Sequence, residues 1–483
     1  MSIDGTFRRP RLPVIGIKSI LLLASMLAMA LFLPISPVQG QTAGKYFNNI
    51  VTIVMENEGI CHILGQNMTH WGITGCSATN YAHYMTGLAQ QWALSLQYVA
   101  VSHPSLPNYL AMFSGQTWAC DNYDGGPNSN TCTSNAWNSV GKNLVDILPS
   151  SVSWKAYMEN MTSNCQTNDS GSYAVRHDPF TYFNDIVGNS TRCGQVVPAG
   201  TNGSLDSTLL NDLNSANAPN LMWLTPNLCD DMHDQCIGTN YQTRNGTCTS
   251  ASHCIPQGDI YLQNLVPKIL SSSTFVRGGA ALFITFDEGN DSTCPVNGSS
   301  QDCVYALWAG PAAKTLYSST TAYGTGHYSW LATVEDNWGL LGSCLVNSCP
   351  PRAVLSEFLT PNFSISTNPS YISIRCTVLG CSPASTVNST LTIASFNQFS
   401  GLVNLNYIAP SNATSGVYVT GQSSATIPLG GSALVTIMAH GGGTISGTFP
   451  WIINGRASSG GFSANTTLTI HYTWCAHCVL PGP

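Results

Sequence analysis

Between residues 44 and 360, short and mainly apolar runs alternate with longer stretches that mix polar and apolar side chains. The clearest runs occupy residues 50–55, 221–224, 280–286 and 304–309. Strands that are apolar on both faces are typical of a sheet covered by helices on both sides, and such sheets are largely parallel. The pattern therefore predicts an α/β domain over residues 44–360, with a largely parallel sheet flanked by helices.

From residue 365 to residue 483 the pattern changes to alternation of apolar residues with hydroxyl or amide residues. The last carboxylate of the chain is Glu357, and the only Lys or Arg residues after it are Arg375 and Arg456. Period-two alternation broken by Gly, Pro, Asn and Ser turns predicts an all-β sandwich. This segment resembles the immunoglobulin-like modules appended to exported archaeal and bacterial proteins, which implies a structural or adhesive role with cell-surface or glycan contacts.

Charged side chains are scarce along the whole chain. They make up 8% of the 483 residues, and the net charge is −7, whereas about 25% is usual in soluble proteins. Binding to a nucleic-acid backbone requires patches of Lys and Arg, and no such patch is present in the sequence. The composition therefore excludes nucleic acid as the main partner.

Residues 1–40 have the composition of a secretory signal. Four basic residues precede an uncharged apolar run over residues 20–33, and the small residue Gly40 ends the stretch that follows. This order predicts a signal peptide over residues 1–40 and a secreted, extracellular protein. The apolar run is shorter than the roughly 20 residues that span a membrane, and the alternative is an uncleaved N-terminal segment that anchors the protein at the cell surface.

The cysteines also indicate export. All 18 of them lie after residue 60, and an even number of cysteines in an exported chain predicts a disulfide framework, whose connectivity the sequence leaves open. The alternative is metal binding through Cys475, His477 and Cys478, or through the cluster Cys229, Cys236, Cys248 and Cys254. Many of the cysteines lie close together in the sequence: Cys61 and Cys76, Cys120 and Cys132, Cys294 and Cys303, Cys344 and Cys349, and Cys376 and Cys381.

Sequons for N-glycosylation are frequent, and they indicate a glycosylated surface. The alternative is that a chain rich in Asn, Ser and Thr forms them by chance. The sequon asparagines are Asn67, Asn160, Asn168, Asn189, Asn202, Asn245, Asn290, Asn297, Asn362, Asn388, Asn412 and Asn465.

Acidic residues gather directly after three of the apolar runs. Because ligands bind beyond the carboxyl ends of parallel strands, these positions are the first candidates for a site. Carboxylates held close together repel one another unless protons or a cation intervene, so the pattern favours a metal site over its alternative, three separate solvated loops. The acidic residues concerned are Glu56, Glu58, Asp230, Asp231, Asp234, Asp287, Glu288 and Asp291.

Two further segments carry residues suited to catalysis. Ser105 precedes a predicted helix, with Pro107 in its first turn and Gly115 at its end. The amino end of a helix favours phosphate and an ionised nucleophile, and the alternative role of Ser105 is a simple helix cap. His327 lies in Gly324-Thr-Gly326-His327-Tyr328, ahead of another predicted helix, where it could reach the same site or serve the structure alone.

Over residues 46–360, the order of these segments resembles the phosphoesterase family of secreted acid phosphatases and bacterial phospholipases C, which is similar to the alkaline-phosphatase superfamily. The motif Ser105-Leu-Pro-Asn108-Tyr, followed by Ser-Gly, carries much of the resemblance. It implies that Ser105 is the nucleophile and Asn108 a donor to phosphate oxygens. We assign Asn57 and His103, which adjoin the motifs, to substrate binding.

The resemblance also implies one or two divalent metal ions. The implied ligands are Glu56, Asp231, His233, Asp287, Glu288 and His327. The chain departs from the superfamily pattern at Glu56, where the usual residue is Asp, and at Glu288, where it is His. The spacing of Asp231 and His233 is unusually tight, so Asp230, Asp234 and Asn227 are alternative partners. The set contains more oxygen than a typical dizinc site, and it leaves Zn, Mg, Mn and Ca open.

These observations predict a secreted, metal-assisted hydrolase of phosphoric esters, most simply an acid phosphatase that forms a phosphoserine. Its substrates would be small phosphate esters or phospholipid head groups. A phospholipase C or phosphodiesterase is the alternative within this chemistry. A catalytically inactive surface or adhesion protein is the alternative of another class. A sulfatase is excluded, because the Cys/Ser-X-Pro-Ser-Arg setting is absent around Ser105.

Overall fold

The computed structural model describes residues 44–200, 206–233, 251–289, 294–298, 302–323, 326–340, 342–349, 352–382, 384–396, 399–413, 416–428, 431–458 and 463–476. The predicted signal peptide over residues 1–40 lies outside these ranges, as do Asp234 and Asp291. All described residues belong to one compact unit, Gln41–Pro483. Within the described ranges, no helix has both the length and the apolar character needed to cross a membrane.

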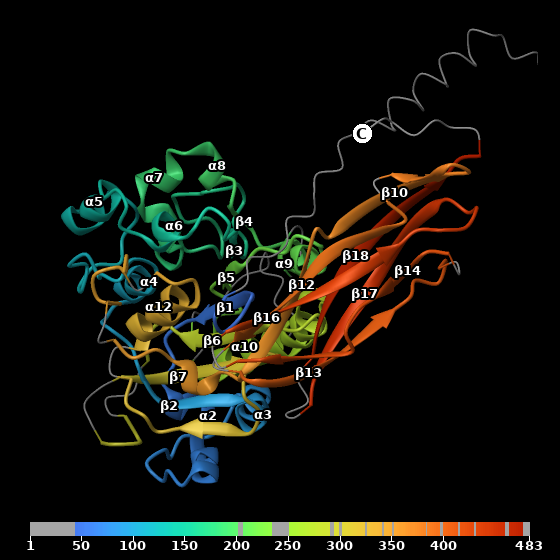
Figure 1. Ribbon diagram of the computed structural model, residues 1–483. Helices are drawn as coiled ribbons and strands as arrows, with labels where there is room; N and C mark the ends of the chain where they lie inside the picture. Colours follow the sequence, from blue (N-terminus) through green and yellow to red (C-terminus); the bar gives the residue numbers. More distant parts are fainter. Residues whose placement is uncertain are drawn as a thin grey trace, which may run out of the picture. The chain divides into compact units, whose positions relative to one another are not determined.

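The α/β part is built on an eight-stranded sheet with the order β4-β3-β5-β1-β6-β7-β2-β8 (Figure 1). β7 runs antiparallel to both of its neighbours, and the remaining pairs are parallel, so the sheet is mixed. Four strands contain the apolar runs read from the sequence: β1, β5, β6 and β7. The strands are β1 Asn49–Met55, β2 Ala93–Val99, β3 Trp154–Met158, β4 Val196–Pro198, β5 Leu221–Thr225, β6 Ala280–Phe286, β7 Cys303–Ala309 and β8 Tyr317–Ser319.

Helices connect and cover these strands, and α4 packs against α12 while α3 packs against α10. The α-helices are α2 Ile60–Leu64, α3 His83–Gln91, α4 Ser105–Ser114, α5 Thr131–Trp137, α6 Leu144–Ile147, α7 Asn184–Val187, α8 Ser190–Cys193, α9 Ser207–Leu213, α10 Ala251–Leu270, α11 Ser273–Val276 and α12 Gly326–Asn337. Short 3₁₀ helices are η1 Gly65–Trp71, η2 Val175–His177, η3 Pro179–Tyr182 and η4 Ser356–Phe358. The prediction of an α/β fold in this part of the chain is confirmed.

The described residues after residue 360 form strands without helices, as the alternation predicts. These strands form a six-stranded sheet, β11-β10-β18-β17-β13-β15, and a four-stranded sheet, β14-β16-β12-β9. Buried residues from both sheets, such as Ile374, Ile393 and Ile453, belong to one apolar core. The strands are β9 Asn362–Asn368, β10 Tyr371–Thr377, β11 Gly380–Ser382, β12 Thr386–Phe396, β13 Gly401–Ile408, β14 Tyr418–Thr420, β15 Ser424–Ile427, β16 Ser432–His440, β17 Gly447–Ala457 and β18 Ser463–Trp474.

The predicted disulfide framework is present. Each of the five cysteine pairs that lie close in the sequence is joined by a disulfide. Cys229, Cys254 and Cys475 are also disulfide-bonded, which is incompatible with their use as free thiolate ligands. The other members proposed for a cysteine metal site, Cys236, Cys248, His477 and Cys478, lie outside the described residues.

Candidate active site

Three neighbouring strands bring the acidic segments to one edge of the sheet. β1 lies between β5 and β6, and Met55 is paired with Phe286, so Glu56 and Asp287 leave the sheet side by side. The Asp287 backbone N–H donates to the carbonyl of Met55 at 3.0 Å, and the Glu56 N–H donates to the carbonyl of Asp231 at 3.0 Å. The register of the sheet therefore places all three acidic segments around one point.

Ser105 lies at the first position of α4, beside this acidic edge. Its side chain is 4% exposed, and its hydroxyl donates a hydrogen bond to Oε1 of Glu56. The helix ends at Gly115, whose φ of 70° favours glycine. The backbone N–H of Leu106 donates to Oδ1 of Asp124 at 2.9 Å, so a carboxylate from another loop caps the helix.

Glu56 is held from its other oxygen by His177, which the sequence analysis did not identify. His177 Nε2 lies 2.8 Å from Glu56 Oε2, and its ring stacks on Tyr109. Burial alone would raise the pKa of Glu56, but the charge and hydrogen bond of His177 and the Ser105 hydrogen bond lower this pKa to about 2. Glu56 is therefore a fixed anion that orients the hydroxyl of Ser105.

Arg176, which precedes His177 in η2, is a second residue that the sequence analysis missed. Its guanidinium pairs with Asp124, Nε to Oδ2, at 3.1 Å. The short helix η2 thus contacts two carboxylates, Glu56 through His177 and Asp124 through Arg176. These two carboxylates bind the adjacent residues Ser105 and Leu106 of α4. The short helix η2 therefore supports the start of α4 through both carboxylates.

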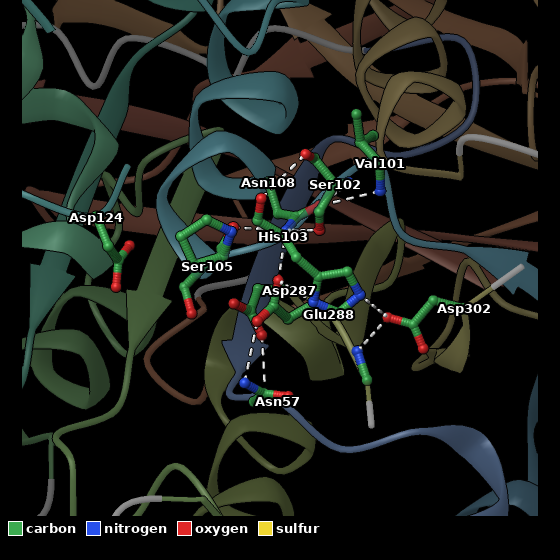
Figure 2. A network of polar contacts seen from close by, with 12 residues as sticks. Asn57, Val101, Ser102, His103, Ser105, Asn108, Asp124, Asp287, Glu288 and Asp302 are labelled. Carbon is green, nitrogen blue, oxygen red and sulfur yellow. Dashed lines mark hydrogen bonds and ion pairs between the residues drawn. The ribbon is translucent and has the colours of Figure 1, made fainter. Parts of the chain in front are cut away.

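Glu288 forms the centre of a second network at the site (Figure 2). It lies 2.9 Å from Nδ1 of His103 and accepts a 3.0 Å bond from the Asn57 amide. Asp302 contacts the other ring nitrogen of His103 at 3.2 Å, and the hydrogen bonds to Asp302 and Glu288 raise the pKa of His103 to about 10. His103 is thus an imidazolium, and its side chain is 59% exposed.

Asn57 and Asn108 connect neighbouring parts of the site through hydrogen bonds. Asn57 adopts φ 48°, a left-handed conformation that Asn tolerates, and its backbone N–H donates to Asp287 at 2.9 Å. The Asn108 side-chain carbonyl accepts from the N–H groups of Val101 and Ser102 at 2.9 and 3.0 Å. Its amide donates to Ser102 and to Glu288. Asn108 therefore holds the loop before Ser105 and contacts Glu288, and its assignment to phosphate oxygens stays a prediction.

The remaining candidates from the sequence, His327, Asp231 and His233, make other contacts near this edge of the sheet. His327 is fully buried, and its ring nitrogens contact the backbone carbonyl of Asp287 and the hydroxyl of Tyr98. Burial lowers the pKa of His327 to about 4, so its ring is neutral. Asp231 accepts a 3.0 Å bond from the backbone N–H of His233. The structure thus places His327 behind Asp287, in contact with its main chain.

Comparison with known proteins fits this geometry. Residues 74–341, more than half of the chain, match the sequence model of the phosphoesterase family. The chain belongs to the phosphoesterase family. The family membership expected from the Ser105 motif and the strand-end acids is thereby confirmed.

Curated relatives of this phosphoesterase chain include a phosphate-repressible acid phosphatase of Penicillium chrysogenum. It is 26% identical over 323 residues, which cover 65% of this chain and 64% of that protein. A phosphatidylinositol-3-phosphatase of Mycobacterium tuberculosis is 25% identical over 346 residues, 70% of this chain and 92% of that protein. The chain thus spans less than two thirds of the Penicillium protein, and 59% of an acid phosphatase of Aspergillus fumigatus that it also matches.

Solved structures with similarity to this phosphoesterase chain are more distant. A protein of the alkaline phosphatase superfamily from Vibrio parahaemolyticus has a TM-score of 0.40 at 12% identity, over 64% of this chain and 71% of that chain. The lipoteichoic acid synthase LtaP from Listeria monocytogenes has a TM-score of 0.41 at 11% identity, over 82% of this chain and 90% of that chain.

The acidic edge fits a hard cation by its donor chemistry. Burial and the nearby charges of Glu56 and Glu288 raise the pKa of Asp287 well above its usual value, and its buried Oδ2 has no hydrogen-bond partner among the residues that the structure describes. A divalent cation would offset this repulsion, and carboxylate oxygens suit Mg, Mn or Ca. In the described part of the chain, no group of three His, Cys, Asp or Glu side chains is already arranged to hold a metal ion.

Proposed function

We propose that this phosphoesterase chain hydrolyses phosphoric esters, with Ser105 as the nucleophile. The observation that carries the proposal is the Ser105 hydroxyl, buried at the start of α4 and bonded to Glu56. The family match and the relatives named acid phosphatase support it. Ser105 Oγ would attack phosphorus as the bond to the leaving oxygen breaks, and water would then hydrolyse the phosphoserine.

The side chains around Ser105 have distinct tasks in this reaction. Glu56 accepts the hydroxyl hydrogen bond and orients Oγ, while His177 and the Tyr109 hydroxyl hold Glu56. Arg176 and the imidazolium of His103 supply positive charge for the phosphoryl oxygens. Glu56, Asp287 and Glu288 would hold a divalent cation, which when bound lowers the pKa of the attacking hydroxyl and neutralises phosphoryl charge.

We propose a phosphate monoester as the substrate class, in keeping with the relatives named acid phosphatase and phosphatidylinositol-3-phosphatase. A diester or phospholipid head group remains the alternative substrate. A panel of mono- and diesters, assayed across pH with and without chelator, tests both the reaction and the preference. Hydrolysis of no phosphate ester by the folded protein would support the alternative of an inactive surface protein.

The rest of the chain is proposed to serve an exported enzyme. Residues 1–40 would be a signal peptide or an uncleaved anchor, and the disulfides support passage through an oxidising compartment. Residues 365–483 would form a separate immunoglobulin-like sandwich that contacts a cell surface or glycan, and residues 44–360 the catalytic domain. N-terminal sequencing of the secreted protein tests the cleavage site.

A further inference from the structure

Two cysteines differ from the rest of the described chain. Every other described cysteine is disulfide-bonded, whereas Cys165 and Cys193 are thiols. Cys165 is buried in the main apolar core, and Cys193 is half-buried and packs against the same core. The sequence analysis includes both in the predicted disulfide framework, but it assigns a partner to neither.

The fold brings these two cysteines together. Cys165 follows β3, and its backbone N–H donates to the carbonyl of Val196 in β4 at 3.1 Å. Cys193 ends α8, and a turn closed by Gln195 N–H on the Arg192 carbonyl, at 2.9 Å, leads from it into β4. The Cys193 thiol lies close enough to raise the pKa of the Cys165 thiol through a side-chain interaction. The backbone hydrogen bonds and the side-chain interaction therefore both place Cys165 next to Cys193.

The surroundings argue against a metal-binding role for the pair in the folded protein. Burial raises the pKa of the Cys165 thiol, and the contact with Cys193 raises it further, so the thiolate that would bind a metal is disfavoured once the chain has folded. The exchange that forms a disulfide would therefore take place during folding, before Cys165 is buried. A pair of neighbouring thiols in a chain rich in disulfides is well placed for oxidation to a disulfide.

We propose that Cys165 and Cys193 form a further disulfide in the exported protein. The bond between the two Sγ atoms forms as both thiols lose their protons and together give up two electrons. The oxidant is a disulfide of the oxidising compartment, carried by an oxidoreductase or a small thiol. Its own S–S bond breaks, and it leaves as two thiols after exchange through a mixed disulfide.

This disulfide would close the segment over residues 166–192 into a loop. The segment contains η2, which places His177 on Glu56 and Arg176 on Asp124. Cross-linking the two ends reduces the conformations open to the loop when it is not packed. The disulfide therefore acts as a clamp that keeps η2 against the nucleophile segment.

Peptide mapping of the full-length protein, secreted through an oxidising compartment, tests the pairing directly. Free thiols are alkylated under denaturing conditions, and the protein is digested without reductant. We expect a linked peptide that contains Cys165 and Cys193, with the Cys61–Cys76 link as internal control. Alkylation of both Cys165 and Cys193, while Cys61 and Cys76 stay linked, would overturn the proposal.

Variants provide a second test that does not depend on peptide recovery. Cys165→Ser and Cys193→Ser should each lower Tm by about 5 °C or more, because each removes the same bond. The double variant should match the single ones, since only one bond is lost. A decrease in Tm in the double variant that equals the sum of the two single decreases would contradict a disulfide. Single variants with the Tm and the reductant sensitivity of the wild type would also contradict it.

Discussion

Asp178 should make the stability of the protein depend on pH, and the structure gives the sign and size of this effect. Asp178 is fully buried and accepts hydrogen bonds from the Tyr173 hydroxyl at 3.0 Å and the Phe180 N–H at 3.1 Å. Burial raises its pKa from 3.8 to about 7, although these hydrogen bonds act in the opposite direction. Because the folded state holds the proton more tightly than the unfolded state, protonation stabilises the fold.

The contribution of Asp178 is fully present below about pH 4 and is lost as the pH rises through about 7. A shift of roughly 3 pKa units corresponds to about 4 kcal/mol of unfolding free energy, at 1.36 kcal/mol per unit. In Asp178→Asn, the buried group stays neutral at every pH. We therefore expect the variant to approach or exceed wild-type stability at pH 8, and to lose its advantage as the pH falls to 4.

Urea unfolding followed by tryptophan fluorescence at several values between pH 4 and pH 8 measures this difference. Comparing variant with wild type at each pH cancels the groups that both proteins share. Tyr173→Phe removes a hydrogen bond that lowers the pKa of Asp178, so it should move the pH-dependent region upward. A free-energy difference between Asp178→Asn and wild type that stays constant from pH 4 to pH 8 would refute the reasoning.

Three further predictions concern the site and the domains. His177→Asn should lower kcat at least tenfold with little change in the circular dichroism spectrum, because Glu56 loses its 2.8 Å partner; unchanged kcat would show that this contact is dispensable. Exhaustive chelation should abolish turnover, and added Mg or Mn should restore it; full activity without metal would contradict the proposed cation site. In calorimetry, Asp287→Asn should weaken metal binding, whereas the control Asp146→Asn should not, because Asp146 is paired with Arg192. A chain that ends at Asn362 should fold and hydrolyse small esters, and its unfolding would show that the β sheets belong to the catalytic unit.

The sequence predicts the acidic edge of the site because strand ends obey a simple rule. β1, β5 and β6 are mainly apolar, and parallel neighbours in register end at the same edge, so Glu56, Asp231 and Asp287 had to meet. The β sheets after residue 360 were predictable for a similar reason, since alternation fixes which side chains face the core. The even number of cysteines likewise predicted a disulfide framework, whereas the pairing itself had to come from the structure.

The supporting residues could not be predicted in this way. His177 and Arg176 lie in η2, and Asp124 and Asp302 lie in irregular segments, where no periodicity predicts direction. The motif placed Asn108 in the helix, but it could not predict the contacts of its side chain with the loop that precedes Ser105 and with Glu288. Contacts between such loops depend on tertiary packing, and a single sequence carries no local signal for them.

The central claim is that Ser105 attacks phosphorus, and trapping the intermediate tests it most directly. The protein is mixed with a phosphate monoester, quenched in acid within the first turnovers, and digested for mass spectrometry. We predict phosphate on the peptide that contains Ser105, and neither phosphopeptide nor turnover in a folded Ser105→Ala variant. Phosphate on another residue, or wild-type turnover by Ser105→Ala, would contradict the account.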